Sequence, residues 1–299
     1  AAPCRTLLTS SPNGFDWSPP HELFPAYPND TTRVIMHQRC GFYLAPNGVF
    51  LALGFYGVVS GDDGPPFGAH GIGRVARRIY EDGAFGPIYY VKHSQHRCHD
   101  IAPQLPFYTQ ADDAMRAACD ALLHDRIKTL EWWDEQRNDE QFFAHADVAD
   151  ELSAISLYRN QRYLIGVGKW GRVVFSEDDG ASWRDGGVLE NLPTNGAKVW
   201  AQKLSNGKFA LVCNPTSHNN HRWPLAVVTS DDGLQFDDLR CIVGEVPPMR
   251  YAGRFKDLGP QYVRGLEVGD APDGALWLAY SMNKEDIYVA RVPVKKALM

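Results

Sequence analysis

Hydrophobic and polar residues alternate along short segments that are separated by turns, a pattern that predicts β-strands rather than helices. Two stretches of the chain repeat the same order of strand, tight turn, strand, loop, strand, polar turn and strand. Their predicted strands are Ala154–Tyr158, Tyr163–Val167 and Arg172–Phe175 in the first stretch, and Lys198–Lys203, Phe209–Cys213 and Pro224–Val228 in the second.

Two further sets of predicted strands have the same spacing. They are Met36–Leu44, Val49–Phe55, Gly73–Tyr80 and Ile88–Lys92 near the start, and Val263–Val268, Leu276–Tyr280 and Ile287–Val292 near the end. Four-stranded units repeated every 45–50 residues or so are typical of β-propeller blades. We therefore predict an all-β fold of about four to five blades, in which residues 1–299 form a single β-propeller domain or the C-terminal part of one that lacks N-terminal blades.

One segment departs from the strand pattern. Between about residues 110 and 137 the apolar positions follow helical spacing, and Thr109 with Asp112 three residues later resembles a capping box. The pattern predicts one long helix in an insertion that covers about residues 93–149. The Trp132-Trp133 pair on this helix is predicted to pack in the core rather than to bind a ligand.

A short polar motif follows the third strand of two sets. Residues 176–183 read S-x-D-x-G-x-S-W, residues 229–236 read T-x-D-x-G-x-x-F, and residues 10–17 form a weaker copy with Pro12 in place of the aspartate. The aspartate is expected to accept backbone N–H groups within the turn, the glycine to take the left-handed conformation, and the aromatic residue to pack beneath. We expect these turns to be structural rather than catalytic.

Composition narrows the possible partners. The net charge is −6 and the sequence has no basic blocks, which argues against nucleic-acid binding, and its longest apolar stretch is too short to cross a membrane. Six cysteines permit three disulfides, and Asn29-Asp30-Thr31 is a glycosylation sequon. Both features favour a secreted, extracellular or periplasmic protein.

The aspartate-containing turns resemble the Asp boxes of the sialidase-like β-propellers, also known as BNR repeats, and the resemblance covers most of the chain. The segments 74–80, 82–89 and 283–287 resemble the propeller enzymes that include ulvan lyases, rhamnose–glucuronate lyases and rhamnosidases. The arginine-containing F/Y-R-I-P motif of true sialidases is not found in this sequence. The resemblance implies a carbohydrate-active enzyme.

The resemblance also implies where a substrate would lie. In these propellers the substrate sits over the central axis, on loops that join the second strand to the third and the fourth strand to the next blade. Applied to the predicted strands, this rule selects His70, Trp170, His218, His221, Arg222, Arg250, Tyr251, Arg254 and Gln261 from the loops. It also selects His37, Arg39, Lys198, Trp200 and Arg264 at the starts of inner strands.

This set lacks the pair of carboxylates that most glycosidases use, since Glu245 and Asp257 are the acids near the last loop. Its histidines, tyrosines and arginines instead suit β-elimination from a uronic acid, in which arginine neutralises the carboxylate and histidine or tyrosine moves protons. We predict His70 or His221 as the base, Tyr251 as the acid or partner base, and Arg254 with Arg264 as neutralising groups. Alternatively, the histidines are solvated loop residues and the arginines pair with Asp257.

Residues 93–100 hold three histidines, one cysteine and one aspartate, a density that permits a structural metal near His93, His96 and His99. The spacing fits no known zinc module, so a solvated loop or a substrate contact is the simpler interpretation, and no cofactor is expected.

Three functions remain open from the sequence. The first is cleavage of an acidic, uronate-containing poly- or oligosaccharide by elimination. The second is glycoside hydrolysis of the sialidase or rhamnosidase type, and the third is a propeller that binds glycans or proteins without catalysis, because a propeller fold alone fixes no activity.

Overall fold

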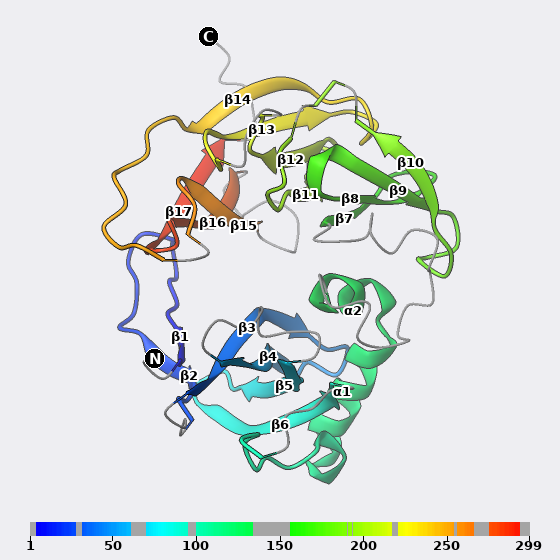
Figure 1. The fold of residues 1–299 in the computed structure, drawn as a ribbon. Helices are drawn as coiled ribbons and strands as arrows, with labels where there is room; N and C mark the ends of the chain where they lie inside the picture. The colour runs from blue at the N-terminus through cyan, green and yellow to red at the C-terminus, as the bar shows by residue number, and fades with distance from the viewer. Residues whose placement is uncertain are drawn as a thin grey trace. The chain divides into compact units, whose positions relative to one another are not determined.

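The computed structural model describes residues 4–27, 32–60, 70–94, 100–133, 156–189, 191–192, 194–216, 221–253, 256–265 and 275–293. The chain divides into two compact units, Ala1–Ala144 and His145–Met299, and each is described by itself (Figure 1). None of the helices in the described part of the chain is both long and apolar enough to span a membrane.

The first unit is built on one four-stranded antiparallel sheet with the strand order β3-β4-β5-β6. Its strands are β3 (Arg33–Leu44), β4 (Phe50–Ser60), β5 (Gly71–Ile79) and β6 (Phe85–His93), and a separate hairpin is formed by β1 (Thr6–Leu8) and β2 (His21–Phe24). Alternate residues of β4 point to opposite faces of the sheet, as the period of a strand requires. Both faces are buried, which explains why β4 is apolar almost throughout.

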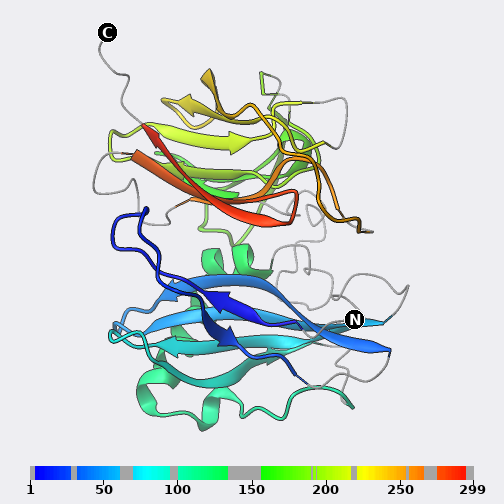
Figure 2. The ribbon, with the colours of Figure 1, turned by 90° about the vertical axis from the view of Figure 1, so that its left-hand side faces the viewer.

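Different elements cover the two faces of this sheet. Leu51 and Leu53 of β4 pack with helix α1 (Asp113–His124), which lies along the sheet in Figure 1. Ala52 lies in another cluster with Leu23 and Phe24 of the hairpin, which crosses the sheet in Figure 2. The sheet is therefore the middle layer of the first unit.

The predicted helical segment is confirmed, but it is two helices rather than one. Helix α1 ends at His124, since the backbone of the next residue, Asp125, is extended, and α2 (Arg126–Trp133) follows. The capping prediction was wrong, because the side chain of Asp112, not Thr109, accepts the first-turn N–H, that of Met115, at 2.8 Å. Trp132 is buried in the core, as predicted, and residues 134–155 lie outside the described residues.

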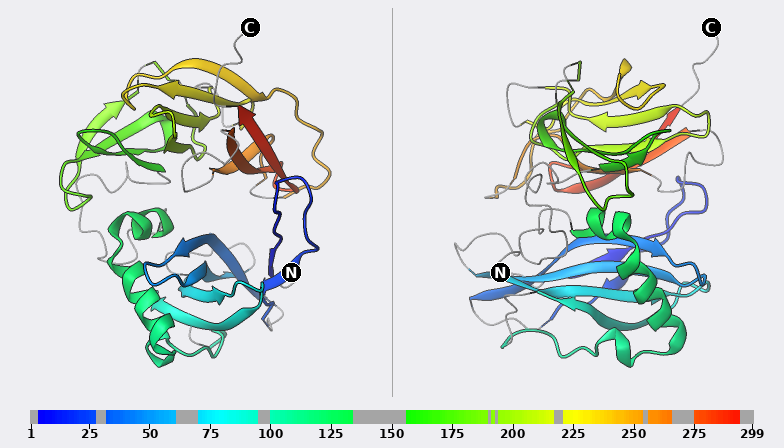
Figure 3. Two further views of the ribbon diagram at one scale, coloured as in Figure 1. Left: turned by 180° about the vertical axis from the view of Figure 1, so that it is seen from behind. Right: turned by 90° about the vertical axis from the view of Figure 1, so that its right-hand side faces the viewer.

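The described residues of the second unit form three antiparallel sheets, whose strands can be followed in Figure 3. Their strands are β7 (Ser156–Arg159), β8 (Leu164–Val167), β9 (Arg172–Ser176) and β10 (Arg184–Val188) in the first sheet, β11 (Trp200–Lys203), β12 (Phe209–Cys213), β13 (Leu225–Ser230) and β14 (Asp237–Val243) in the second, and β15 (Pro260–Gly265), β16 (Ala275–Met282) and β17 (Asp286–Pro293) in the third. These up-and-down sheets are propeller blades, and the all-β prediction is confirmed.

Both strong copies of the polar turn form the expected hydrogen bonds, but in the second copy the aspartate differs from the prediction. Asp178 accepts the N–H of Ser182 at 2.8 Å. In the second copy the acceptor is Asp232, which receives the N–H groups of Leu234 and Gln235. The neighbouring Asp231 pairs instead with a lysine outside the turn.

The weaker copy at residues 10–17 is also a real turn. Asn13, not Pro12, stands where the aspartate does, and its side-chain oxygen accepts the N–H groups of Phe15 and Asp16 at 2.9 Å. The predicted register was wrong by one residue, because the acceptor directly precedes the glycine here, as Asp232 does in the second copy. An asparagine amide oxygen takes the place of the carboxylate.

The cysteines of the described chain are unpaired. Cys4, Cys40, Cys119, Cys213 and Cys241 are free thiols, and Cys98 lies outside the described residues. The disulfides that the even count permits are therefore not formed among these five.

Candidate active site

In the second unit, the connections between the second and third strands of each sheet lie at one end of the sheets, which we call the loop end. They are residues 168–171, 214–224 and 283–285, and residues 194–199 and 244–259 join them from the links between sheets. The polar turns, residues 176–183 and 230–236, lie at the opposite end, which we call the turn end. This division follows from antiparallel strand order.

Two basic side chains from one loop meet a single carboxylate at the loop end. His221 Nδ1 lies 3.6 Å from Asp257 Oδ1, and Arg222 Nε lies 3.5 Å from Asp257 Oδ2. The Asp257 side chain is 22% exposed, and that of His221 is 63% exposed. The histidine is therefore oriented by a carboxylate that is mostly buried while its ring remains accessible, an arrangement suited to proton transfer.

The backbone holds these two loops in contact. The N–H of Arg222 donates to the carbonyl of Leu258 at 3.1 Å. Gly259 has a φ of 101°, and a Cβ there would lie 2.4 Å from the carbonyl oxygen of Arg222. Only glycine permits this approach, so the loop that carries His221 and the loop that carries Asp257 are joined where their side chains meet.

Tyr262 lies between two cations at the same end. Its ring is 5.3 Å from the Arg222 guanidinium and 5.3 Å from the Lys284 ammonium group, and the residue is 43% exposed. Tyr262 has a φ of 55° and falls where the pairing of β15 with β16 shifts register. A bulge of this kind redirects a side chain, and here it brings a phenol next to two positive charges.

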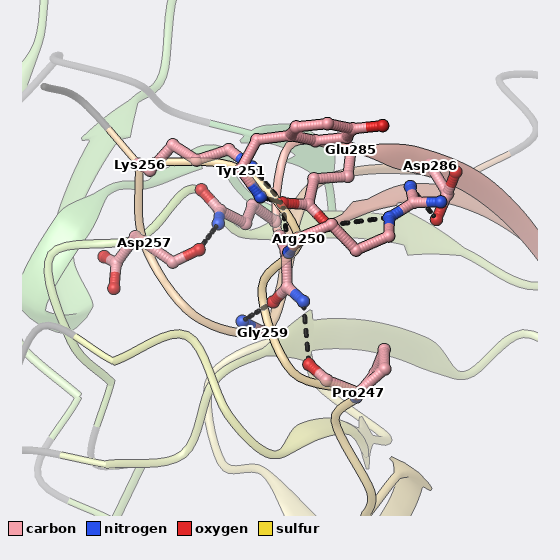
Figure 4. Close-up of polar contacts among 10 residues, drawn as sticks. Pro247, Arg250, Tyr251, Lys256, Asp257, Gly259, Glu285 and Asp286 are labelled. Atoms are coloured by element: carbon pink, nitrogen blue, oxygen red, sulfur yellow. Dashed lines mark hydrogen bonds and ion pairs between the residues drawn. The ribbon is translucent and has the colours of Figure 1, made fainter. Parts of the chain in front are cut away.

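A buried carboxylate organises the loop at residues 247–256 (Figure 4). The Glu285 side chain is 3% exposed and accepts from Lys256 Nζ, from Arg250 Nε at 3.2 Å, and from the backbone N–H groups of Arg250 and Tyr251 at 2.9 Å. The Lys256 ammonium group, with the N–H of Tyr251 and the Arg250 guanidinium, lowers the pKa of Glu285 to about 2. Glu285 is therefore an ionised anchor rather than a proton donor.

Asn283 completes this anchor. Its side-chain oxygen accepts the N–H of Gly259 at 2.7 Å, and its Nδ2 donates to the carbonyl of Pro247 at 2.9 Å (Figure 4). Asn283 and Lys284 have φ values of 56° and 55°, so the β16–β17 turn contains two left-handed residues in succession. The turn thus places Asn283 against both ends of the 247–259 loop and Glu285 against residues 250, 251 and 256 within it.

Some of the predicted site residues gather at the loop end, and others do not. His221, Arg222, Arg250 and Tyr251 are brought to the two clusters described above. The alternative pairing of Arg250 with Asp257 was wrong, because Arg250 pairs with Glu285 and with Asp286 at 2.7 Å.

Gln261, Trp200 and Arg264 are predicted residues that contact their neighbours in the second unit. Gln261 is 2% exposed and donates to the backbone carbonyl of Asp257 at 2.6 Å. Trp200 is buried, with its Nε1 donating to Gln202, and the Arg264 guanidinium lies 5.4 Å from the Trp200 ring. Trp200 therefore offers a ligand little of its surface. Lys198 is half-buried just before β11.

Trp170 lies half-exposed in the β8–β9 connection of the second unit, and the remaining predicted residues lie in the first unit or outside the described chain. His37 is buried, stacks on Tyr56 at 4.5 Å, and contacts Thr6 Oγ1 at 3.1 Å. Burial lowers the pKa of His37 to about 4, so this histidine is neutral near pH 7. Arg39 sits at a bulge in β3 with a φ of 53°, and His70 lies half-buried before β5. His218, Arg254, His96 and His99 lie outside the described residues.

The metal suggested near His93 stays a prediction. Among the described residues, the His93 ring has two aromatic neighbours. Its centre lies 4.6 Å from that of the Tyr90 ring and 5.5 Å from that of the Phe107 ring.

The predicted set omits Tyr262, Lys284 and Glu285, and Asp257 was considered only as one of two acids near the last loop and as an ion-pair partner. The β16–β17 turn obeys the same rule that selected the other loops, and that rule applied to residues 283–285 finds Lys284 and Glu285. Tyr262 gave no such signal, because a bulge inside a strand is not visible in the hydrophobic pattern.

Comparison with known proteins supports this architecture. Residues 1–148 match the family described as "Beta-prop_BT_1020:-like, N-terminal beta propeller". A solved structure of a sialidase matches 98% of this chain with a TM-score of 0.83 and 31% sequence identity, and the chain spans 28% of the length of that sialidase. The comparison with curated proteins finds no match.

Two other solved structures are much more distant. An endo-1,5-α-L-arabinanase from Thermotoga petrophila matches 47% of this chain and 39% of its own, at 14% identity and a TM-score of 0.35. A sialidase from Trypanosoma rangeli matches 96% of this chain and 37% of its own, at 11% identity and a TM-score of 0.30. At such low scores neither match bears on what this chain does.

Proposed function

We propose that this chain, whose blades are those of the sialidase-like β-propeller superfamily, binds an acidic sugar at the loop end and takes part in cleaving its glycosidic linkage. The observation that carries the proposal is the meeting of His221 and Arg222 at Asp257, with Tyr262 beside the same arginine. The 31% identity with a sialidase over nearly the whole chain supports a glycan as the substrate class.

The charges suit a sugar carboxylate. The guanidinium of Arg222 and the ammonium group of Lys284 flank Tyr262 from two different loops. In the described part of the chain, Arg222 Nη1 is a buried donor with no hydrogen-bond partner, a condition often explained by a ligand or water. A planar guanidinium matches a carboxylate in two parallel hydrogen bonds.

The residues present fit β-elimination. His221 takes the proton from the carbon next to the carboxylate, the electron pair forms the new double bond, and the bond from the neighbouring carbon to the leaving oxygen breaks. Arg222 neutralises the carboxylate and stabilises the charge that develops on it. Tyr262 returns a proton to the leaving oxygen. In this proposal Arg222 takes the role predicted for Arg254 with Arg264, and Tyr262 takes the role of acid predicted for Tyr251.

Hydrolysis is the second candidate, and a different observation favours it. Tyr251 is 66% exposed, lies 5.5 Å from the Arg250 guanidinium and 5.6 Å from the Lys256 ammonium group, and is held through its backbone by Glu285. Some glycosidases use a tyrosine as the nucleophile. In this reaction the Tyr251 oxygen would bond to the anomeric carbon as the bond to the leaving oxygen breaks and that oxygen takes up a proton. Water would then displace the tyrosine oxygen and release the sugar.

One assay separates the candidates. Uronate-containing polysaccharides and oligosaccharides are incubated with the protein while ultraviolet absorbance and reducing ends are measured in parallel. Elimination raises both, because it leaves a double bond conjugated to the carboxylate, whereas hydrolysis raises only reducing ends. Binding with neither signal indicates a non-catalytic propeller.

Matched variants test the site. Arg222→Ala is compared with Arg162→Ala, which removes an exposed arginine at the turn end. Loss of turnover in Arg222→Ala alone supports the proposed carboxylate contact. Equal turnover in both variants removes Arg222 from the mechanism.

A further inference from the structure

Trp170 occupies a position that a bulky side chain rarely takes. It lies in the β8–β9 connection, in the short element η5 (Lys169–Gly171), with φ 59° and ψ 23°. For a bulky residue such a backbone conformation is an outlier that costs roughly 1–3 kcal/mol and persists mainly at functional sites. The residue is nevertheless 49% exposed, so burial of its ring does not explain the strain.

The indole is fixed from one side by a glycine. A Cβ at Gly196 would lie 2.9 Å from Trp170 Cζ2 and 3.2 Å from its Cε2, so the ring lies directly on the backbone of Gly196. The N–H of Trp170 donates to the carbonyl of Asn195 at 3.1 Å. The ring is held in place from below and presents the rest of its surface to solvent.

Asn195 also contacts the loop of the proposed site. Asn195 is 1% exposed, and its Nδ2 donates to the backbone carbonyl of His221 at 2.7 Å. Its side-chain oxygen accepts the N–H of Ala197 at 2.8 Å. One buried residue therefore positions both Trp170 and the loop that carries His221.

Trp223 shows the contrast with a structural tryptophan at the same end. It is 46% exposed, but its Nε1 donates to the carbonyl of Gly244 at 2.8 Å and ties the β12–β13 loop to the end of β14. Among the described residues, the Trp170 side chain has no such hydrogen bond. No side-chain hydrogen bond among the described residues therefore explains its exposure and its backbone conformation.

We propose that Trp170 is the stacking platform of a second sugar-binding subsite, which takes the pyranose ring next to the acidic sugar of an oligosaccharide. The inference rests on the proposed function, because it places that acidic sugar at His221 and Arg222. The apolar C–H face of a sugar ring packs on an exposed indole, which keeps its polar N–H at the edge. Substrates of two or more sugars therefore gain contacts that a single acidic sugar lacks.

The test measures binding as a function of chain length. Neutral and uronate-containing oligosaccharides of one to six sugars are titrated against the wild type, Trp170→Ala, Trp170→Phe, Arg222→Ala and Trp17→Ala by calorimetry. Trp17→Ala is the matched control, since Trp17 is 45% exposed and lies in the polar turn of the first unit. Loss of an exposed tryptophan that contacts the ligand is expected to weaken binding about ten-fold or more.

The expected result is that Trp170→Ala weakens binding of the longer oligosaccharides about ten-fold and leaves the single acidic sugar unchanged. Trp170→Phe retains much of the length dependence, and Trp17→Ala behaves as the wild type. Equal length dependence in Trp170→Ala and the wild type overturns the inference while leaving the proposed function intact.

Other outcomes separate the two proposals. Neutral oligosaccharides that bind through Trp170, with Arg222→Ala unchanged, support the platform and contradict the acidic-sugar site. No binding of any oligosaccharide by the wild type overturns both.

Discussion

The two ends of the sheets in the second unit satisfy their polar groups in different ways. At the turn end, Asp178 and Asp232 accept hydrogen bonds from residues two to four positions away in their own turns. At the loop end, Glu285 accepts from Arg250, which lies 35 positions earlier in the chain. Hydrogen bonds within a turn fix the shape of that turn, whereas the bonds to Glu285 form only when loops that are far apart in the sequence are assembled.

The difference predicts that function resides at one end and local stability at the other. The largest expected effect is from His221→Asn, which removes the proposed base at the loop end. We expect turnover to fall about 100- to 10,000-fold with the thermal unfolding temperature unchanged, since the side chain is mostly exposed. Steady-state kinetics and calorimetry measure the two quantities. Normal turnover in this variant would exclude His221 from the chemistry.

Glu285→Gln should have the second-largest effect on turnover, because it removes the negative charge that the surrounding N–H donors contact. The loop that carries Arg250 and Tyr251 then loses its anchor, and misplaced groups can cost about 100-fold in rate. Asp286→Asn is the matched control, since Asp286 is exposed and contacts the same arginine. Equal loss of activity in Glu285→Gln and Asp286→Asn would contradict the view that the buried Glu285 carboxylate is what holds the loop end together.

Acid should affect both ends over the same range of pH. Hydrogen bonds from Ser182 lower the pKa of Asp178 to about 2, and contacts led by Lys256 lower that of Glu285 to about 2. Because both pKa values lie below their ordinary values of 3.8 and 4.5, the stability from each group is present above those values and is lost as pH falls towards 2.

Unfolding temperatures from pH 6 to pH 2 test this expectation. The wild type should lose stability below about pH 4.5, and Glu285→Gln and Asp178→Asn should each show a smaller loss than the wild type. An unchanged acid profile in Asp178→Asn would show that its turn contributes nothing that depends on charge.

The smallest expected effect is at the turn end. Ser230 is buried, accepts the N–H of Gly233 at 2.8 Å, and donates to Asp232 at 2.9 Å. Ser230→Ala should lower the free energy of unfolding by about 1–3 kcal/mol without changing turnover. Denaturant unfolding and the cleavage assay measure the two; a fall in turnover at unchanged stability would contradict the division between the ends.

The same contrast explains what the sequence could predict. The strands were located within a few residues, because alternation is a local property; Phe209–Cys213 matches β12 at both ends. The polar turns were also found, although the acceptor was misplaced at Asp231 and Pro12. The order of residue types alone does not show which of two adjacent aspartates accepts the hydrogen bonds of the turn.

The site was predicted only in part. His221, Arg222 and Tyr251 were found because they lie on loops that strand order places at one end. Tyr262 was missed because its exposure depends on a bulge in β15. Glu285 lies on the β16–β17 turn, which the loop rule also selects, but its partners come from a segment more than thirty residues away, so no local pattern predicts its part as an anchor.

The most direct test of the loop end as the binding site is amide hydrogen exchange with and without a uronate oligosaccharide. We predict slower exchange in residues 221–224, 250–253 and 283–285 when the sugar is bound, and no change in the turns at 176–183 and 230–236. Protection confined to the turn end, or protection at neither end under conditions where the sugar binds, would contradict the account.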